Sequence, residues 1–137
     1  MTDAVVEIEG GFDRLDVDFI YELLRQTHWA RDRPRDVFER AIKHSLCFGA
    51  YEGKRQLGFA RVVTDHATFG YLMDVVVDPA WRGRGIGRSL LKRVLEDPVV
   101  SSLRTLLLRT ETAHGLYRKA GFALAPNSQD LMARYRA

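Results

Sequence analysis

A glycine-rich loop between an apolar strand and an amphipathic helix constrains this 137-residue chain more than any other segment. The β-branched run Val75–Val77 indicates a buried strand, a proline-marked turn follows it, and Gly83, Gly85 and Gly87 then alternate with arginines. A helix that begins near Gly85 has no Ser, Thr, Asp or Asn at its cap, so its first N–H groups lack a side-chain acceptor. Water is one partner for these groups. A phosphate beside the positive end of the helix dipole is the other.

The glycine spacing excludes two standard nucleotide-binding loops. The dinucleotide fingerprint requires G-x-G-x-x-G, but the sixth position counted from Gly83 is Arg88. The P-loop requires Gly-Lys-Ser/Thr, but Gly87 is followed by Arg88 and Ser89. A pyrophosphate could still bind the uncapped N–H groups and gain charge-assisted contacts from the loop arginines, which are Arg82, Arg84 and Arg88.

The composition predicts a single soluble globular domain over residues 1–137. Hydrophobic residues make up 46% of the chain and charged residues 28%, which is ordinary for such a domain. The net charge is only +3, but one basic cluster exceeds it without an intervening acidic residue: Arg82, Arg84, Arg88, Lys92 and Arg93. Such a cluster is often a solvated helix face, and its overlap with the glycine loop favours an anionic ligand.

The location and the chemistry of the chain are also constrained by what its sequence lacks. No apolar run approaches the roughly 20 residues of a membrane span, and the acidic start is unlike a signal peptide, so we expect a cytoplasmic protein without membrane contact. The single cysteine, Cys47, lies in an apolar run and is predicted to be a buried, inert thiol. The four histidines and this cysteine show no metal-ligand spacing, so we expect no metal.

Hydrophobic periodicity predicts an α+β fold, an α/β sandwich with antiparallel hairpins followed by a strand–helix–strand unit. The helices expected are 16–26 with Asp16 as N-cap, a second from about 34 to 42, 86–95 ending before Pro98, and 111–120. The strands expected are 4–9, 46–51, 57–64, 68–77, 103–109 and a weak final strand at 130–135.

Two segments resemble motifs of the GNAT superfamily of N-acetyltransferases. Arg82-Gly83-Arg84-Gly85-Ile86-Gly87 is similar to the acetyl-CoA signature R/Q-x-x-G-x-G/A, and Ala113–Phe122 is similar to the later motif A-x-x-L-Y-x-K-x-G-F. The resemblance covers residues 4–135 in element order. It departs from the family at Thr110, where members often carry Asn, so a cofactor contact from that side chain is open.

The resemblance implies a GNAT-like mixed sheet with antiparallel N-terminal strands and about four flanking helices. It implies that the parallel strands 68–77 and 103–109 splay apart, so that the pantetheine arm of acetyl-CoA pairs with main chain near Val75 and Val77. The pyrophosphate would lie on the loop from Arg82 to Ser89. The cofactor-binding residues implied in this way are Val75, Val77, Arg82, Gly83, Arg84, Gly85, Gly87, Arg88 and Ser89.

Family members generally transfer the acetyl group directly to an amine, and Tyr117 matches the usual acid position. A phenol with a pKa of about 10 is protonated at neutral pH and could donate to a thiolate whose reference pKa is about 8.5. The alternative is that Tyr117 only packs its helix against the sheet. A backbone N–H in the splayed strand, such as that of Val75, could stabilise the oxyanion. A lysine-like amine requires about 4.6 kcal/mol to reach its neutral form at pH 7, so a base or water is needed.

The base and the acceptor pocket are the open parts of the prediction. Asp74 interrupts an apolar strand and is a candidate base, although it could instead orient neighbouring backbone. Strand alternation puts Asp74 on the face of Leu72 and Val76, opposite to Tyr71 and Met73, where a family base on this strand tends to lie. His66, His114 and Glu111 are further candidates. Trp29 and Tyr71 are the candidate acceptor-binding residues, and Trp29 could equally cover the core.

The function predicted is therefore acetyl-CoA-dependent N-acetyl transfer to a primary amine of a small molecule or protein. The alternative is a non-catalytic acyl-CoA-binding sensor or assembly module. A nucleic-acid binder is disfavoured, because no nucleic-acid motif or interleaved exposed aromatic residues accompany the basic cluster. The resemblance also makes a homodimer unsurprising.

Overall fold

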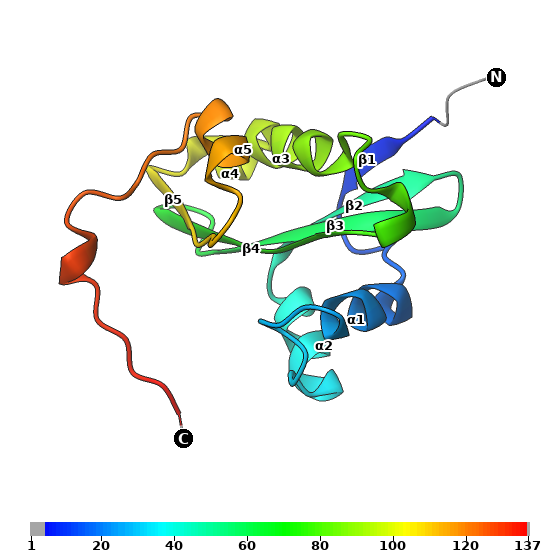
Figure 1. Ribbon diagram of the computed structural model, residues 1–137, viewed down its shortest axis with the longest axis horizontal. Coiled ribbons are helices and arrows are strands. Elements are labelled where there is room, and N and C mark those ends of the chain that lie inside the picture. Colours follow the sequence, from blue (N-terminus) through cyan, green and yellow to red (C-terminus); the bar gives the residue numbers. More distant parts are fainter. Residues whose placement is uncertain (1–4, 137) are drawn as a thin grey trace.

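A five-stranded mixed sheet lies between two layers of helices in the computed structural model, which describes residues 5–136 (Figure 1). The strands, in spatial order, are β1 (Glu7–Gly10), β2 (Leu46–Glu52), β3 (Arg55–Thr64), β4 (Phe69–Val77) and β5 (Thr105–Leu108). Strands β1 to β4 pair antiparallel, and β5 joins β4 in parallel. The predicted α+β fold is confirmed, while residue 4 of the expected first strand lies outside the described residues.

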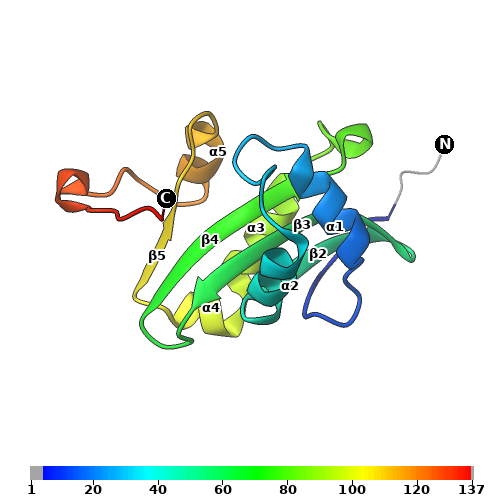
Figure 2. The ribbon, with the colours of Figure 1, turned by 90° about the horizontal axis from the view of Figure 1, so that it is seen from below.

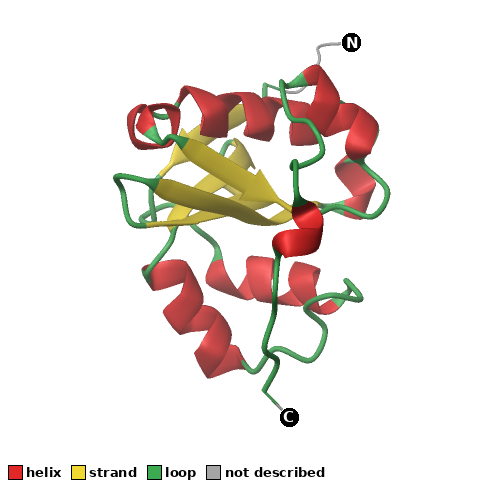
Figure 3. Ribbon diagram, turned by 90° about the vertical axis from the view of Figure 1, so that its left-hand side faces the viewer, coloured by secondary structure: helices red, strands yellow, loops and turns green. Residues whose placement is uncertain are grey.

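Helices cover both faces of the sheet, as Figure 3 shows from the side. Helices α1 (Val17–Arg25) and α2 (Arg35–Lys43) form the first layer; α3 (Ile86–Glu96), α4 (Pro98–Ser102) and α5 (His114–Lys119) form the second. Asp16 caps α1 as predicted, because its Oδ1 accepts a hydrogen bond from the Phe19 N–H at 3.1 Å. The short α4 was missed. Asp97 both ends α3 and caps α4, and Pro98 occupies a first-turn position.

The core consists of two clusters, one on each face of the sheet. Under α3 and α4 the buried side chains include Leu57, Val62 and Leu90. Under α1 and α2 they include Ile20, Phe38 and Phe59. Each fully buried side chain of this size contributes about 1.5–3 kcal/mol, so the two clusters hold both helical layers on the sheet. Among the described residues, none of the helices has the length and apolar character required to cross a lipid bilayer.

The prediction of a weak final strand at 130–135 was wrong. A short 3₁₀ helix, η2 (Ser128–Asp130), is followed by exposed residues 131–136 that belong to no strand. These residues stand apart from the body of the molecule in Figure 1. A strand exists only when its backbone pairs with a neighbouring edge, and here this segment has none.

Candidate active site

The parallel strands β4 and β5 pair over only part of their length. Phe69 lies opposite Thr105 and Leu72 opposite Leu108, whereas residues 73–77 of β4 have no β5 partner within the described chain. Figure 2 shows the two strands separating toward the end of β4. Backbone groups on this edge of β4 are therefore available to an extended ligand.

A β-bulge at Asp74 lies where the two strands separate. Phe59 and Arg61 of β3 lie opposite Val76 and Met73, so β4 has one more residue than β3 between these positions. Asp74 has a φ of +55°, in the left-handed region that Asp adopts more readily than most residues. Bulges of this kind redirect side chains and are frequent beside active sites.

The bulge overturns the predicted alternation of β4. A regular strand would place Leu72, Asp74 and Val76 on one face. In the structure Leu72 packs beneath α3, whereas Val76 packs beneath α1 and α2. Val75 and Val77 pack on the α3 side. The prediction failed because a period of two does not continue across an inserted residue.

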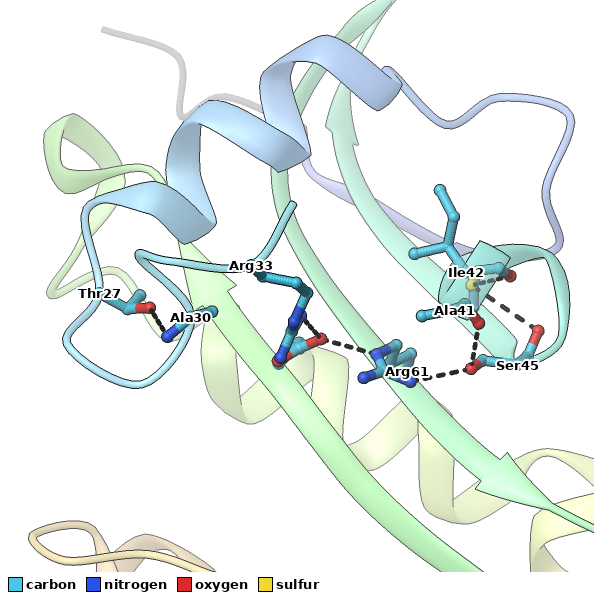
Figure 4. Close-up of polar contacts among 9 residues, drawn as sticks. Thr27, Ala30, Arg33, Ala41, Ile42, Ser45 and Arg61 are labelled. Atoms are coloured by element: carbon cyan, nitrogen blue, oxygen red, sulfur yellow. Dashed lines mark hydrogen bonds and ion pairs between the residues drawn. The ribbon is translucent and has the colours of Figure 1, made fainter. Parts of the chain in front are cut away.

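The Asp74 carboxylate is held in the interior by Arg33 and Arg61, the two arginines that Figure 4 labels. Arg33 donates to Oδ2 at 2.8 Å and to Oδ1 at 3.3 Å, and Arg61 Nε donates to Oδ2 at 2.6 Å. A second Arg61 nitrogen donates to Ser45 Oγ at 3.1 Å. Since Arg33 lies in the segment between α1 and α2, this network ties the loop on that side of the sheet to the bulge.

The environment of Asp74 is unfavourable for a general base. Burial by itself raises the pKa of Asp74, but the hydrogen bonds and charges of Arg33 and Arg61 outweigh it and hold that pKa below its ordinary value. The side chain has no solvent exposure. This arrangement favours the alternative role, in which Asp74 orients the bulge.

The glycine loop leads into α3 without a side-chain cap. It begins with the 3₁₀ turn η1 (Pro79–Trp81), and Gly83 and Gly85 then adopt φ values of +78° and +79°. Gly85 is the N-cap of α3, and the Ser89 N–H donates to its carbonyl at 3.0 Å. A Cβ on Gly83, Gly85 or Gly87 would meet no atom within 4 Å. The first turn of α3 thus has no side-chain cap and open space beside its glycines, which leaves room for an anion.

The three loop arginines differ in what they contact. Arg82 Nε donates to the carbonyl of Val77 at 3.3 Å, and Arg84 stacks on Trp81 at 4.5 Å from the ring centroid. Arg88 lines a groove whose other lining residues come from α3, α5 and Ala120. Arg82 and Arg84 thus stabilise the loop itself, while Arg88 extends its positive charge along α3.

The groove between α3 and α5 has a volume of about 500 Å³ and a partly basic rim. Its lining residues are Arg88, Leu91, Lys92, Leu95, Glu96, Leu116, Lys119 and Ala120. The sequence analysis counted Lys92 in the basic cluster but not among the cofactor-binding residues, and it did not single out Lys119. Lys92 could have been identified from its spacing, because residues i and i+4 share one face of a helix.

Tyr117 lies on α5, on the same side of the sheet as α3 (Figure 1). Its ring meets Phe122 edge-on at 5.8 Å, and it packs against the cluster beneath α3. Burial raises the pKa of Tyr117, so its hydroxyl stays protonated at neutral pH. Thr110, where the family often has Asn, accepts a hydrogen bond from the Ala113 N–H at 3.0 Å and stabilises the start of α5.

The loop after α1 meets the loop after β5. His28 Nε2 lies 3.8 Å from Glu111 Oε2, which links these loops beside the separated strands. Trp29 is 54% exposed and stacks edge-on with His28 at 5.4 Å. Trp29 is not among the side chains that pack against either core cluster.

The other candidates are spread along the sheet. Tyr71 is half-buried in β4 opposite Leu107 of β5, on the paired part of the two strands. His114 begins α5, whereas His66 lies in the β3–β4 turn, at the opposite end of β4 from the glycine loop. Within residues 5–136 no three His, Cys, Asp or Glu side chains converge as a metal site requires.

This geometry coincides with a match to the acetyltransferase (GNAT) domain over residues 43–124, more than half of the chain. The chain belongs to the GNAT acetyltransferase family. A GNAT-family protein from Xanthomonas campestris pv. campestris is 44% identical, with a TM-score of 0.91 over 96% of this chain and 94% of that one. The resemblance inferred from the two motifs is confirmed, and acetyl transfer is the general activity of the family.

Other GNAT proteins differ more in sequence. Serotonin N-acetyltransferase 2, chloroplastic, from Oryza sativa subsp. japonica is 30% identical over 129 residues, which are 90% of this chain and 64% of the relative. A protein from Clostridium acetobutylicum, named a predicted acetyltransferase and solved with acetyl-CoA, is 16% identical and shares the fold, with a TM-score of 0.69 over 95% of this chain and 96% of that one. The chain spans about half to two thirds of the length of the curated relatives it matches.

Proposed function

We propose that this chain transfers the acetyl group of acetyl-CoA directly to a primary amine of a small molecule or protein. The observation that carries the proposal is that the unpaired edge of β4 and the uncapped N-terminus of α3 follow one another at the same end of the sheet. An extended amide-containing arm suits the first feature, and a pyrophosphate suits the second. Acetyl-CoA contains both.

The residues present suit the pantetheine arm and the phosphates of acetyl-CoA. Main-chain groups near Val75 and Val77 would pair with its pantetheine arm, and the backbone from Gly83 to Ser89 would hold its pyrophosphate, where a Cβ on the glycines meets no protein atom. Arg88, together with Lys92 and Lys119, would place positive charge along the groove for the remaining phosphate. The bound cofactor supplies an acetyl group activated as a thioester.

The protein contributes proton transfer and charge stabilisation. Tyr117 holds a proton at neutral pH and would donate it to the departing sulfur, whose reference pKa is about 8.5. A backbone N–H at the bulge, near Val75, would donate to the oxygen that gains negative charge. The amine must lose a proton to water or to a side chain, and Glu111 and His114 are the candidate bases that flank this end of β5.

The acceptor would enter from the side of the α1–α2 loop. The exposed ring of Trp29, held beside His28, would line that entrance. Serotonin, named for the rice relative, is a primary amine with an aromatic ring that Trp29 could contact. It therefore joins a polyamine, an amino acid and a lysine-containing peptide in the panel of amines to be tested.

The test measures the free CoA released from acetyl-CoA in the presence of each amine. Tyr117→Phe should reduce the rate about 100-fold with little effect on acetyl-CoA binding, because it removes only the donated proton. Tyr51→Phe, which removes a hydroxyl from β2, should not. Acetyl-CoA binding without turnover of any amine would contradict the proposal and favour a non-catalytic acyl-CoA sensor.

Two further expectations belong to this proposal. We propose that residues 1–137 act as one acetyltransferase domain, and limited proteolysis with acetyl-CoA should leave the span from β1 to α5 undivided. We also propose a cytoplasmic location, whereas the rice relative is named as chloroplastic. Detection in a membrane or organelle fraction would contradict the second expectation.

A further inference from the structure

A second pocket lies at the β1 edge of the sheet. We call it the edge pocket: its lining comes from the end of β1 and the two residues after it, the junction of α2 and β2, and the end of α3. Strands β2 and β3 separate β1 from β4, so the edge pocket lies across the sheet from the separated strands. Its volume is about 440 Å³, within the range of about 300–1,000 Å³ that is typical of small-molecule sites.

The guanidinium group of Arg93 forms part of the wall of the edge pocket. Its Cζ lies 5.4 Å from the centre of the Phe48 ring, and its Nη1 donates to Asp97 Oδ2 at 3.4 Å. Its Nη2 packs so closely on Gly10 that a Cβ at this position would lie 3.0 Å from it. Because Gly10, Phe48 and Asp97 all line the pocket, these contacts hold the guanidinium group at the surface of the pocket.

Arg93 retains donors for a ligand. The bond to Asp97 is the one hydrogen bond that its side chain donates within residues 5–136, and a guanidinium group carries several further N–H groups. The side chain is also 34% exposed. Asp97 is already engaged elsewhere, because its Oδ1 accepts the N–H groups of Val99 and Val100 at 2.9 and 3.3 Å and so caps α4.

A second cation and an apolar wall complete the edge pocket. Lys43, in the last turn of α2, is exposed and belongs to no ion pair of the described chain. With Arg93 and Lys43 against one carboxylate, Asp97, the pocket has one positive charge in excess. Phe12, 41% exposed, and Leu46 add apolar surface. Cations in the last turn of a helix favour the helix itself, but this effect does not require a hollow with an apolar wall between them.

We propose that the edge pocket binds a small aromatic monocarboxylate. The carboxylate would pair with Lys43 and with Arg93, whose planar group can donate two hydrogen bonds to it. The ring would lie against Phe12 and Leu46 and remove their apolar surface from water. The single negative charge of such a ligand matches the single excess positive charge of the pocket. This site is independent of the acetyl transfer proposed above, so its test requires no turnover.

The test is an NMR titration of the ¹⁵N-labelled full chain with phenylacetate. The amides of Gly11, Phe12 and Leu46 should shift and saturate with a Kd of about 1 mM, while those of residues 86–88 in the glycine loop should not move. Arg93→Met should weaken binding about tenfold, because it removes the charge-assisted hydrogen bonds, and Lys43→Met should weaken it severalfold. Arg40→Met is the matched control, since Arg40 is an exposed arginine of α2 that does not line the pocket.

Two further compounds separate the parts of the ligand. Acetate has the carboxylate without the ring, and phenethylamine has the ring with the opposite charge, so both should bind at least about tenfold more weakly than phenylacetate. Equal binding of either compound overturns the proposal, because the site would then not recognise both features. Shifts absent from the pocket amides, or confined to the glycine loop, also overturn it. If Arg93→Met does not fold, Lys43→Met decides whether the cations are used, and unchanged binding by that variant contradicts the proposal.

Discussion

Replacing Asp74 with Asn tests whether the buried network supports the bulge. The substitution keeps the shape of the side chain but removes the charge that compensates Arg33 and Arg61. The carboxylate is fully buried and accepts hydrogen bonds at 2.6, 2.8 and 3.3 Å, while the two arginine side chains are 7% and 18% exposed. The variant therefore leaves two guanidinium groups in the interior without a counter-charge.

The expected cost follows from this burial. Removing one partner of a buried ion pair typically costs about 3–5 kcal/mol, because the remaining charge stays desolvated. For a chain of this length, that loss corresponds to a decrease of roughly 12–20 °C in the melting temperature. Urea unfolding should show the loss as a lower midpoint with an unchanged slope. The low pKa of Asp74 also makes this loss depend on pH. The charge of Asp74 stabilises the fold above the unfolded-state pKa, so the free energies of unfolding of the wild type and of Asp74→Asn should converge as the pH falls below about 4.

Asp18→Asn is the matched control. Asp18 pairs with Arg35 at 2.6 Å, but its side chain is 85% exposed. An exposed pair contributes about 0–1 kcal/mol, so the same chemical change should have little effect there. If Asp74→Asn cost no more than Asp18→Asn, the network would not be a structural anchor. The free carboxylate would then again be a candidate base.

Two further predictions concern the glycine loop and the lone thiol. Gly85→Ala should abolish measurable acetyl-CoA binding in calorimetry, because a Cβ at φ +79° strains the cap of α3 and reaches into the open space beside the loop. Gly53→Ala is the control, because Gly53 has a φ of +56° in a hairpin turn. It should lower the stability of the fold by a similar amount and leave acetyl-CoA binding intact. Burial raises the pKa of Cys47 to about 12, so the unfolded chain loses this proton first and stability should fall as pH rises above about 9. Cys47→Ala should flatten that decline, and an unchanged slope would contradict the assignment.

The glycine loop could be predicted because its determinants are local. Gly83 and Gly85 adopt the left-handed conformations that their residue type permits, and the absence of a capping side chain at Gly85 is visible in the sequence. The two motifs also identified the family, because each places its residues within one turn or one helix. The burial of Cys47 was likewise predicted from its apolar neighbours and is confirmed.

The bulge could not be predicted, because it depends on residues that meet only after folding. Asp74 adopts a positive φ while Arg33 and Arg61, 41 and 13 residues away, hold its carboxylate. One signal was present: Arg61 interrupts an apolar strand next to a strand that Asp74 interrupts. Opposite charges in adjacent buried strands predict an ion pair, and the expected base would then have been recognised as an anchor.

The final strand illustrates a different limit. The alternation in residues 130–135 carries information about a strand, but not about the chain with which that strand pairs. In the structure of one chain the segment remains extended and exposed. An alternating pattern can thus give a wrong secondary structure when no strand edge pairs with the segment.

Amide hydrogen exchange with and without acetyl-CoA tests the central claim most directly, because that claim says where on the chain the cofactor binds. If the separated strands and the uncapped helix form the cofactor site, acetyl-CoA should slow exchange at Ile86–Arg88 and at Val75–Val77. It should leave Glu7–Gly10 of β1 unchanged. Protection confined to other segments, or no protection at saturating acetyl-CoA, would contradict the account.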